Sequence, residues 1–448
     1  MVASPILGGF GVGRSINAVD AQCINLFLEI IDTKDGAAPG YLQMAPGLDL
    51  LVTLGPGPIR GPKIHSLNGI AYVVSGPQLW ALFPNLSSVL LGTLGTSAGN
   101  VSVIDNGSQV AIFDGYAGYL TSTSTVNSGG GVPLTGGTIG AGSAGFAVGD
   151  TINLGAVMGT QDATAVLTVT AETAGVVTSF TVTAPGLFSV APTSFQQVST
   201  SGNGSNFTLT APTFGTATYL SSIALPFSGG PISATYQDGF GLVNDAGTNQ
   251  FYQSDLDDLS QWEPLNFSSA DAKPDAVLAM HDLFREVWLF KTNNIEIWVN
   301  VGQPGFTFQR LQGAFVEAGT CAIFSVAKAG DFFLWLSRTT QGSGIVMMAG
   351  GSGSGLRRMS THAIEYQIAQ YPTIADAIAF AYQQEGHVFY VLTFPTGDAT
   401  WVLDLTTTEK IGYPVWHQRA AFGNGVFSRW WANALMDPSW GVGPQGQG

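Results

Sequence analysis

Residues 101–113 read VSVIDNGSQVAIF, and this stretch decides the fold class. Two short runs rich in Val, Ile and Phe, residues 101–104 and 109–113, flank the dipeptide Asn106-Gly107. An Asn-Gly pair between such runs predicts a tight β-hairpin, because both central residues of that turn need a positive φ. We therefore expect two antiparallel strands here, with residues 118–122 as the next strand.

Similar runs recur along most of the chain, many of them containing the Trp, Tyr, Phe, Val and Ile residues that suit a pleated, half-buried surface. The further runs are residues 69–75, 79–83, 232–236, 240–244, 249–254, 287–291, 295–300, 306–310, 332–337, 345–348, 387–393 and 400–405. Groups of about four strands, repeating every 40–50 residues or so, favour a β-propeller over a sandwich. One helix is expected at residues 362–370, capped by Ser360 or Thr361.

Residues 124–212 differ in composition from the rest of the chain. They contain no Lys or Arg and are dominated by Gly, Thr, Ser, Ala and Val. The runs at 163–170, 176–183 and 206–210 alternate apolar and polar residues, which predicts strands with one face buried. We interpret this stretch as a small β-domain inserted in a loop of the larger one, with a disordered low-complexity tract as the alternative.

The predicted fold is thus all-β: a β-propeller with an irregular N-terminal arm and an inserted small β-domain. The expected boundaries are an N-terminal arm at 1–54, a first propeller segment at 55–123, the insert at 124–212, a second propeller segment at 213–430 and a C-terminal tail at 431–448.

Charged side chains are scarce, at 10% of the 448 residues against about a quarter in ordinary globular proteins. So few charges indicate that obligate assembly partners cover much of the surface, since such interfaces resemble a core cut in half. The net charge of −15 opposes adhesion to DNA or to an anionic membrane, and is compatible with a surface past which DNA slides. We expect neither a signal peptide nor a membrane span.

The acidic cluster Asp255, Asp257 and Asp258 lacks the ligand spacing of a calcium loop. Residues 254–262, SDLDDLSQW, are closer to the turn of sialidase-like propellers, in which Asp and Ser bond the backbone and Trp packs between sheets. We interpret the segment as a structural turn, with calcium binding as the alternative. A sialidase-type activity would need an arginine cluster, whereas Arg357 and Arg358 form the only adjacent pair.

Other residues with chemical potential are scattered. The histidines are His65, His281, His362, His387 and His417, and the cysteines are Cys23 and Cys321. Their spacing predicts neither a metal site nor a disulfide framework. The glycine-rich residues 351–355 lack the Lys-Ser/Thr of a phosphate-binding loop. The sequence therefore predicts no catalytic, cofactor-binding or metal-ligating residue, no cofactor and no enzyme, and it does not locate channel-lining or docking residues.

Several segments together resemble the tail-hub, or nozzle, proteins of short-tailed bacteriophages, also called packaged-DNA stabilisation proteins. The matching segments, in order, are residues 23–27, 40–47, 60–61 with 67–76, 101–107, 251–262 with 265–267, 288–298, 312–317, 360–366 and 382–395. The resemblance implies a homohexameric ring of β-propeller subunits in the virion tail, assembled in the host cytoplasm beneath the portal and adaptor rings. Such a ring extends the DNA channel, helps retain packaged DNA, and anchors tailspikes or fibres and a plug or needle. Double-stranded DNA would pass through the lumen without sequence-specific binding, along a wall that we expect to be acidic or neutral.

The chain departs from the family pattern in two places. The insert is an addition, in which residues 145–154 and 177–186 resemble a small β-module recurrent in phage virion proteins, and we expect it to point outward. Residues 422–448 are short and Gly-rich where the family continues with strands. Either the closing blade is incomplete or an N-terminal segment supplies its missing strand. We predict closure by residues near 1–60, because an open sheet edge is a pairing liability.

Two other classes remain open at this point. One is a glycan-binding or glycan-cleaving propeller, such as a receptor-binding virion protein, which the turn at 254–262 would suit. The other is a solitary propeller adhesion module, which should be monomeric.

Overall fold

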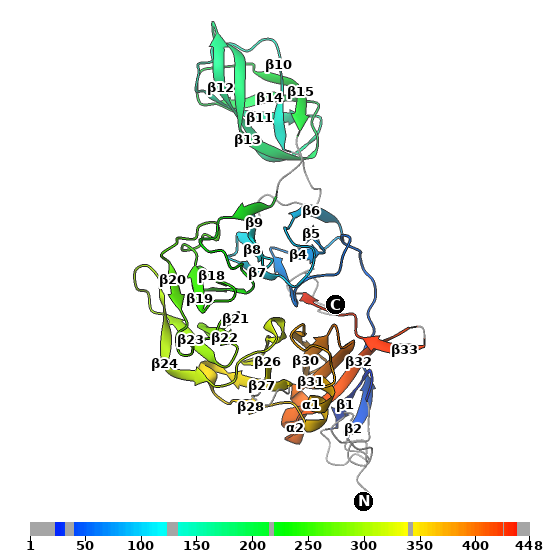
Figure 1. Cartoon of the computed structure of the whole chain (residues 1–448). Coiled ribbons are helices and arrows are strands. Elements are labelled where there is room, and N and C mark those ends of the chain that lie inside the picture. The colour runs from blue at the N-terminus through cyan, green and yellow to red at the C-terminus, as the bar shows by residue number, and fades with distance from the viewer. Residues whose placement is uncertain are drawn as a thin grey trace, which may run out of the picture.

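The computed structural model describes residues 23–31, 40–122, 133–214, 219–338, 344–423 and 425–436. The predicted all-β propeller fold is confirmed: within the described residues, six sheets surround a common axis as blades (Figure 1). In each blade successive strands of the chain pair antiparallel from the axis outward, and the first blade gains one further strand, which is parallel, from the C-terminal region. A further six-stranded sheet stands apart from the ring in the same view.

The first three blades come from the N-terminal and middle regions of the chain. Blade 1 consists of β3 (Lys63–Leu67), β4 (Ile70–Ser75), β5 (Gln78–Leu82) and β6 (Ser88–Thr93), with β34 (Leu435–Met436) beside β3. Blade 2 consists of β7 (Ser102–Asp105), β8 (Gln109–Phe113), β9 (Gly118–Ser122) and β16 (Ser221–Ile223). Blade 3 consists of β17 (Ala234–Gln237), β18 (Phe240–Asn244), β19 (Gln250–Gln253) and β20 (Phe267–Ser269).

The other three blades come from the C-terminal half. Blade 4 consists of β21 (Val277–Leu283), β22 (Glu286–Lys291), β23 (Ile295–Asn300) and β24 (Phe308–Val316). Blade 5 consists of β25 (Ala327–Ala329), β26 (Phe332–Arg338), β27 (Gly344–Gly350) and β28 (Arg357–Arg358), flanked by the short 3-10 helices η2 (Ile323–Ser325) and η3 (Gly351–Gly353). Blade 6 consists of β29 (Ile378–Gln384), β30 (His387–Phe394), β31 (Ala399–Asp404), β32 (Val415–Gly423) and β33 (Val426–Arg429).

The two α-helices accompany the last blades. The predicted helix is confirmed as α1 (His362–Ile368), where the Thr361 hydroxyl accepts a hydrogen bond from the Ile364 N–H. The second helix, α2 (Leu405–Ile411), follows β31 and was not predicted. Neither is long and apolar enough to cross a bilayer, and the same holds for every helix in the described ranges.

The hairpin at 101–113 forms, but its turn is not the predicted one. The last paired residues are Asp105 and Val110, so residues 106–109 make the turn. Only Gly107 has a positive φ, of +90°. The Asn106 side chain instead accepts hydrogen bonds from the N–H groups of Ser108 and Gln109. Asn therefore serves here as a side-chain cap of a longer turn rather than as a residue of positive φ.

The insert forms its own sheet between β9 and β16, the two rim strands of blade 2. Its strands are β10 (Leu134–Ile139), β11 (Thr151–Val157), β12 (Thr160–Thr173), β13 (Val176–Val190), β14 (Ser194–Thr200) and β15 (Thr208–Phe214), in the sheet order β10-β15-β14-β11-β12-β13. Alternate residues of β12, Ala165, Leu167 and Val169, are buried in a separate apolar core, as alternation predicts. β15 ends two residues beyond the expected boundary at 212.

Each of the first five junctions between neighbouring blades is filled by one shared apolar core. Between blades 4 and 5, for example, Trp288 and Phe290 pack edge-on against Phe333 and Trp335. Equivalent cores join blades 1 and 2, 2 and 3, 3 and 4, and 5 and 6. The aromatic pairs between blades 4 and 5 add stability beyond the area they bury. All five junctions hold by direct contact of blade on blade.

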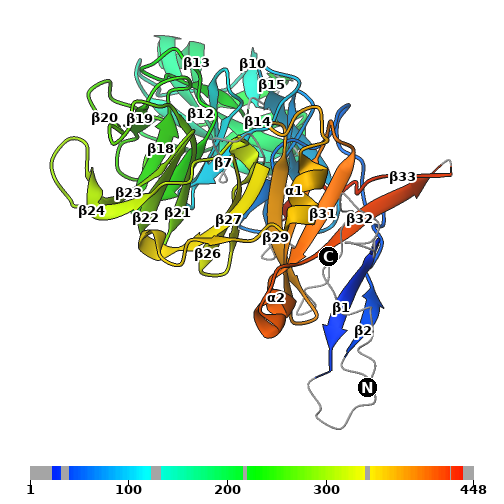
Figure 2. The ribbon, with the colours of Figure 1, turned by 60° about the horizontal axis from the view of Figure 1, so that its bottom comes forward.

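The sixth junction, between blades 6 and 1, is built differently, and we call it the seam. The facing surfaces of the two blades belong to two separate cores. Chain-terminal segments cover both. The hairpin of β1 (Leu26–Ile30) and β2 (Gly40–Met44) lies against blade 6 (Figure 2). β34 runs parallel to β3 of blade 1. Because successive strand residues point to opposite sides, Leu435 joins the core of blade 6 and Met436 that of blade 1.

This arrangement corrects the predicted closure. Blade 6 is complete, since β29 to β32 all come from the C-terminal region of the chain. The N-terminal segment adds to the outer edge of a finished sheet, through a parallel bridge between Ile24 and Gln418. Asn25 reinforces that bridge, since its side-chain amide exchanges two hydrogen bonds with the backbone of Ala420. Residues 1–22 and 437–448 lie outside the described residues.

Candidate functional site

The N-terminal hairpin is fastened to blade 6 by a histidine between two carboxylates. His387 on β30 lies 2.7 Å from Asp404 through Nδ1 and 2.7 Å from Glu29 of β1 through Nε2. The hydrogen bond to Asp404, and then that to Glu29, raises the pKa of His387. Phe27 packs edge-on against the His387 and Phe389 rings. The contact joins residues more than 350 positions apart, so it ties the start of the chain to its last blade.

Next to this contact, two buried polar side chains lack hydrogen-bond partners. Both ring nitrogens of His417 and the Nε and Nη2 atoms of Arg419 are buried and unpaired. The Arg419 guanidinium lies over the rings of Tyr382, Phe389 and Trp430, at 4.9 Å from the last. Burial lowers the pKa of Arg419 and lowers that of His417 to about 3. An aromatic cage therefore replaces the usual carboxylate at this arginine.

The end of blade 6 projects from the ring as a two-stranded ribbon (Figure 2). This ribbon, residues 420–423 and 425–429, is called the arm below. It consists of the end of β32 and all of β33, paired from Ala420–Arg429 to Gly423–Val426. Phe422 and Phe427 face each other across the strands with ring centroids 5.0 Å apart. They are 67% and 55% exposed and Val426 is 63% exposed, so the arm presents an apolar surface to its surroundings.

A second exposed apolar segment follows β2. Leu48, Leu50 and Leu51 are all more than half exposed. Ala45, just before them, shares a core with Trp430 at the base of the arm. Large apolar side chains that are exposed together mark protein interaction sites more often than isolated ones do. The seam side of the propeller is therefore a candidate interaction surface.

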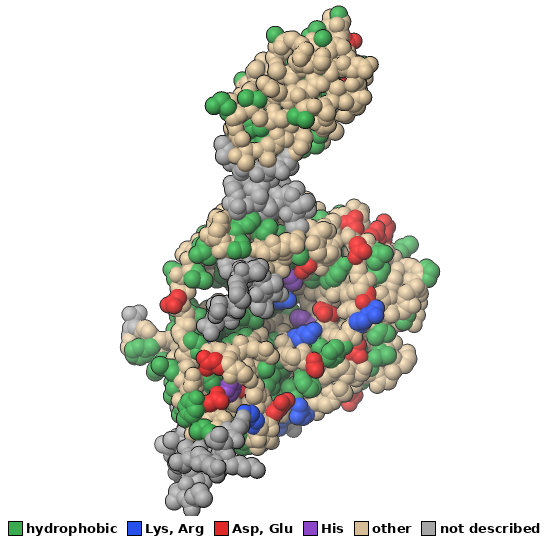
Figure 3. Space-filling view, turned by 180° about the vertical axis from the view of Figure 1, so that it is seen from behind, with side chains coloured by type: hydrophobic (Ala, Val, Ile, Leu, Met, Phe, Trp, Pro, Cys, Tyr) green, Lys and Arg blue, Asp and Glu red, His purple; other side chains and the backbone are tan. Residues whose placement is uncertain are grey.

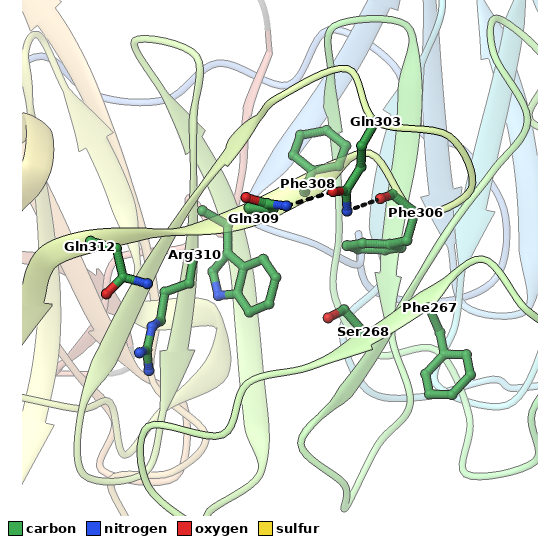
Figure 4. Close-up of a pocket in the computed structure, with 9 residues that line it drawn as sticks. Phe267, Ser268, Gln303, Phe306, Phe308, Gln309, Arg310 and Gln312 are labelled. Atoms are coloured by element: carbon green, nitrogen blue, oxygen red, sulfur yellow. Dashed lines mark hydrogen bonds between the residues drawn. The ribbon is translucent and has the colours of Figure 1, made fainter.

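A groove lies on the other flank, between the rims of blades 3 and 4 (Figure 4). Its volume is about 430 Å³, and it is lined by Phe267, Ser268, Trp298, Gln303, Phe306, Phe308, Gln309, Arg310 and Gln312. Gln303 donates to the Phe306 carbonyl and accepts from Gln309, so amides form part of its wall (Figure 4). The Trp298 indole N–H is buried and has no hydrogen-bond partner. The lining includes one arginine and no carboxylate, which leaves the groove without an acid/base pair for glycan cleavage.

The acidic cluster at 255–258 belongs to a turn that joins blade 3 to blade 2. Asp258 accepts hydrogen bonds from Ser260 and Gln109, and these bonds lower its pKa. The Trp262 indole donates to the Leu259 carbonyl and packs edge-on against Phe113 of blade 2. The segment thus has the side-chain-to-backbone bonds and the inter-sheet tryptophan expected of a structural turn. Within the described residues, no group of three or more His, Cys, Asp and Glu could hold a metal ion.

The other residues singled out from the sequence lie in separate places. Arg358 pairs with Glu365 and so holds α1 to blade 5, while Arg357 is exposed. His65 contacts Asp105 between blades 1 and 2, at 3.2 Å. Cys23 is buried and Cys321 half-buried, and neither forms a disulfide bond. Only His387 and His417 lie together, beside the same phenylalanine rings.

Comparison with known proteins places this geometry in a family. A family model described as Bacteriophage P22 Gp10, beta-propeller, matches residues 143–434, well over half of the chain. The chain belongs to this phage propeller family. It is therefore a structural β-propeller protein of a bacteriophage and a component of the virion. The resembling segments before residue 143 lie outside the matched span.

The solved structures that it is similar to are propellers of low sequence identity. They include the WD40 domain of Neurospora crassa Pan2 (7% identity, TM-score 0.38, covering 82% of this chain and 80% of that one). The Cps50 (Swd1) β-propeller domain of Myceliophteria thermophila has 7% identity and a TM-score of 0.33, covering 77% and 96%. Kluyveromyces lactis Hsv2 has 8% identity and a TM-score of 0.31, covering 81% and 98%. No curated protein matches the chain.

Proposed function

We propose that this phage propeller protein is the subunit of a homohexameric tail nozzle, or hub, ring. In this proposal the ring sits below the portal and adaptor, extends the DNA channel and helps retain the packaged genome. It also anchors tailspikes or fibres, and a plug or needle. Membership of the phage propeller family carries the proposal, and the exposed apolar arm supports it because such a surface needs a protein partner.

The scarcity of positive charge fits a ring through which DNA passes. The whole chain has 15 Lys and Arg against 30 Asp and Glu. On the face in Figure 3 uncharged surface predominates, and the charged side chains of the propeller include acidic and basic ones that lie side by side. A DNA-binding protein neutralises phosphates with Lys and Arg, so a lumen poor in both would let the duplex slide. We expect the lumen wall to be acidic or neutral for this reason.

The insert supports a role in docking other tail components. It folds around its own core, separate from those of the propeller, and shows almost no charged side chain in Figure 3. A module of this kind can change without disturbing the ring that carries it. We therefore assign it to contact with a spike or fibre on the outside of the tail.

Electron microscopy of the purified protein in negative stain tests the proposed ring directly. We expect six-fold rings with a central hole about as wide as a DNA duplex. Native mass spectrometry of the same sample should give the mass of six chains. A protein that stays monomeric at every concentration contradicts the proposal, and so does a ring whose lumen is dense in Lys and Arg.

A glycan-binding virion protein is the second candidate, and the groove of blades 3 and 4 is the feature that favours it. Aromatic rings beside amide side chains can stack on and hydrogen-bond a sugar. This candidate predicts a monomer that binds a glycan array and loses binding when Phe267→Ala removes the most exposed ring of the groove. Six-fold rings without glycan binding would leave the nozzle as the function.

A further inference from the structure

Within the part of the chain that the structure describes, the arm lacks a layer that would cover its apolar side chains. A two-stranded hairpin in water is marginally stable at best, because it has no third layer against which to bury its apolar side chains. Phe422, Val426 and Phe427 all lie on this ribbon and are more than half exposed. In the described structure no strand pairs with the outer edge of β33, so its free N–H and C=O groups can also bind another chain.

The groove between blades 3 and 4 offers the apolar contacts and hydrogen-bonding groups that the arm lacks. Its volume of about 430 Å³ is within the range of about 300–1,000 Å³ of ligand pockets, and it is open on its outer side, as docking of a strand requires. Phe267 and Phe306 provide apolar contacts, and the glutamines and Arg310 can bond free backbone groups of an edge strand. The unpaired indole N–H of Trp298 is a further donor. Residues 420–428 contain no charged side chain, so the part of the arm that precedes Arg429 would bring no second charge next to Arg310.

The positions of the two features decide which copy fills the groove. β33 and β24 lie on opposite flanks of the propeller disc (Figure 1). The arm of one copy therefore cannot enter its own groove. A contact between two different surfaces on opposite flanks leaves one of each free, so that copies add head to tail until a ring closes.

We propose that the arm of each copy docks in the groove between blades 3 and 4 of the next copy, with Phe422, Val426 and Phe427 as its apolar anchors. This inference rests on the proposed ring and names the surfaces that build it. The arm, fastened at its base by the hydrogen bond from the Arg429 N–H to Asp398, keeps a fixed direction from blade 6. The exposed leucines after β2 extend the same contact along the seam.

Single-surface variants of the full chain test the docking. The arm variant is Phe422→Ser with Phe427→Ser, the groove variant is Gln309→Trp, which fills the groove, and Tyr116→Ser on blade 2 is the matched control for loss of an exposed aromatic ring. We expect the arm and groove variants to weaken self-association at least about thirtyfold, as loss of one central aromatic anchor does. The control should assemble like the unaltered chain. Thermal unfolding of isolated monomers should be unchanged in all three.

Mixing the arm variant with the groove variant tests whether the contact between copies is head to tail. A head-to-tail contact leaves one intact arm and one intact groove in each mixed pair, so native mass spectrometry should show dimers and no rings. Copies carrying Val426→Cys and copies carrying Gln309→Cys should form disulfides only when mixed. Rings that persist in both variants overturn the docking and leave the nozzle proposal intact, whereas an unaltered chain that never assembles overturns both. A groove variant that assembles normally while the arm variant fails shows that the arm binds elsewhere.

Discussion

The junction of blades 4 and 5 and the seam between blades 6 and 1 solve the same packing problem in different ways. In the first, aromatic side chains of both blades share one core, with Trp335 fully buried at its centre. In the second, the two blades keep separate cores and the ends of the chain fill the space. A blade cannot leave the first junction without exposing that core. The seam can lose a terminal segment while each blade keeps its own sheet.

The comparison teaches that closure of the propeller between blades 6 and 1 is separable from folding of the blades themselves. Segments with few buried partners open at a lower free energy than the core that they cover. The N-terminal hairpin has two strands and is held by Phe27, Asn25 and the Glu29–His387 contact. We therefore expect the seam to be the first junction to open, and the following changes test that difference.

The largest effect should come from removing a buried aromatic side chain, at the junction of blades 4 and 5 in one variant and at the seam in another. Trp335→Ala leaves a cavity between blades 4 and 5 and frees the Gly319 carbonyl that its indole bonds, so global stability should fall by about 3–5 kcal/mol. Phe27→Ala removes a ring that is equally buried, but we expect it to release only the hairpin. Denaturant unfolding measures the first effect, and amide hydrogen exchange of residues 24–30 the second.

Equal losses of global stability in the two variants would show that the seam is as cooperative as the other junctions. Phe195→Ala is the matched control, because it removes a buried ring from the insert, which has its own core. That variant should unfold the insert and leave exchange in both junctions unchanged.

Replacing either of two buried arginines should change stability by a smaller amount, and the sign of the change should differ between the two. Arg60 of blade 1 donates to the carbonyls of Gly76, Thr96, Ala98 and Gly99, so its charge is compensated. Arg419 has unpaired donors inside an aromatic cage. Arg60→Met should destabilise the protein by about 1–3 kcal/mol, since it leaves buried carbonyls without a donor. Arg419→Met should be neutral or stabilising by about 1–4 kcal/mol, because an apolar side chain of similar volume removes a buried charge.

Unfolding midpoints in urea, measured on both variants at one pH, decide between these outcomes. A clear loss of stability in Arg419→Met would mean that the cation–π contacts with Tyr382 and Trp430 outweigh the cost of burying the charge. The prediction of an uncompensated arginine would then be wrong.

The sequence predicted the blades well and the seam poorly. Runs such as residues 287–291 and 295–300 became β22 and β23, because a buried strand needs the apolar and β-branched residues that a sequence displays. Residues 435–436 were assigned to a tail, since two residues cannot show a period. Their strand exists only through β3, which lies about 370 positions earlier. α2 was missed among threonines, although Asp404 before it and Gly412 after it are ordinary capping residues.

The candidate interaction surfaces could not be predicted from the sequence for a related reason. Phe422 and Phe427 look like core residues in a sequence, and only the ribbon shows that no layer covers them. The groove combines residues of two blades, and nothing in their spacing places Phe267 beside Gln309. The turn at 254–262 was accessible because some of its hydrogen bonds, such as those from Ser260 to Asp258 and from Trp262 to Leu259, join residues of the same short segment.

The smallest predicted effects are pH dependences of opposite sign at two neighbouring histidines of the seam. His417 has a folded-state pKa of about 3, below the unfolded value of about 6.5. Between these values the unfolded chain binds a proton that the folded chain does not. His417 therefore makes stability fall on acidification, by about 2 kcal/mol from pH 7 to pH 5. His417→Phe should remove this loss.

His387 works in the other direction, because its hydrogen bonds to Asp404 and Glu29 raise its folded-state pKa above the unfolded value. Its contribution is complete below about pH 6.5 and is lost as the pH rises through the folded-state pKa. Urea unfolding of the unaltered chain, His417→Phe and His387→Gln at pH 5, 7 and 9 separates the two, since other carboxylates titrate alike in all three. The difference in stability between His387→Gln and the unaltered chain should shrink with rising pH. The protection of the N-terminal hairpin against hydrogen exchange, relative to the intrinsic exchange rate at each pH, should fall over the same range in the unaltered chain. A difference that grows with pH would mean that His387 is held neutral, and that the hairpin is fastened without an ion pair, by packing around Phe27 and the hydrogen bonds of Asn25.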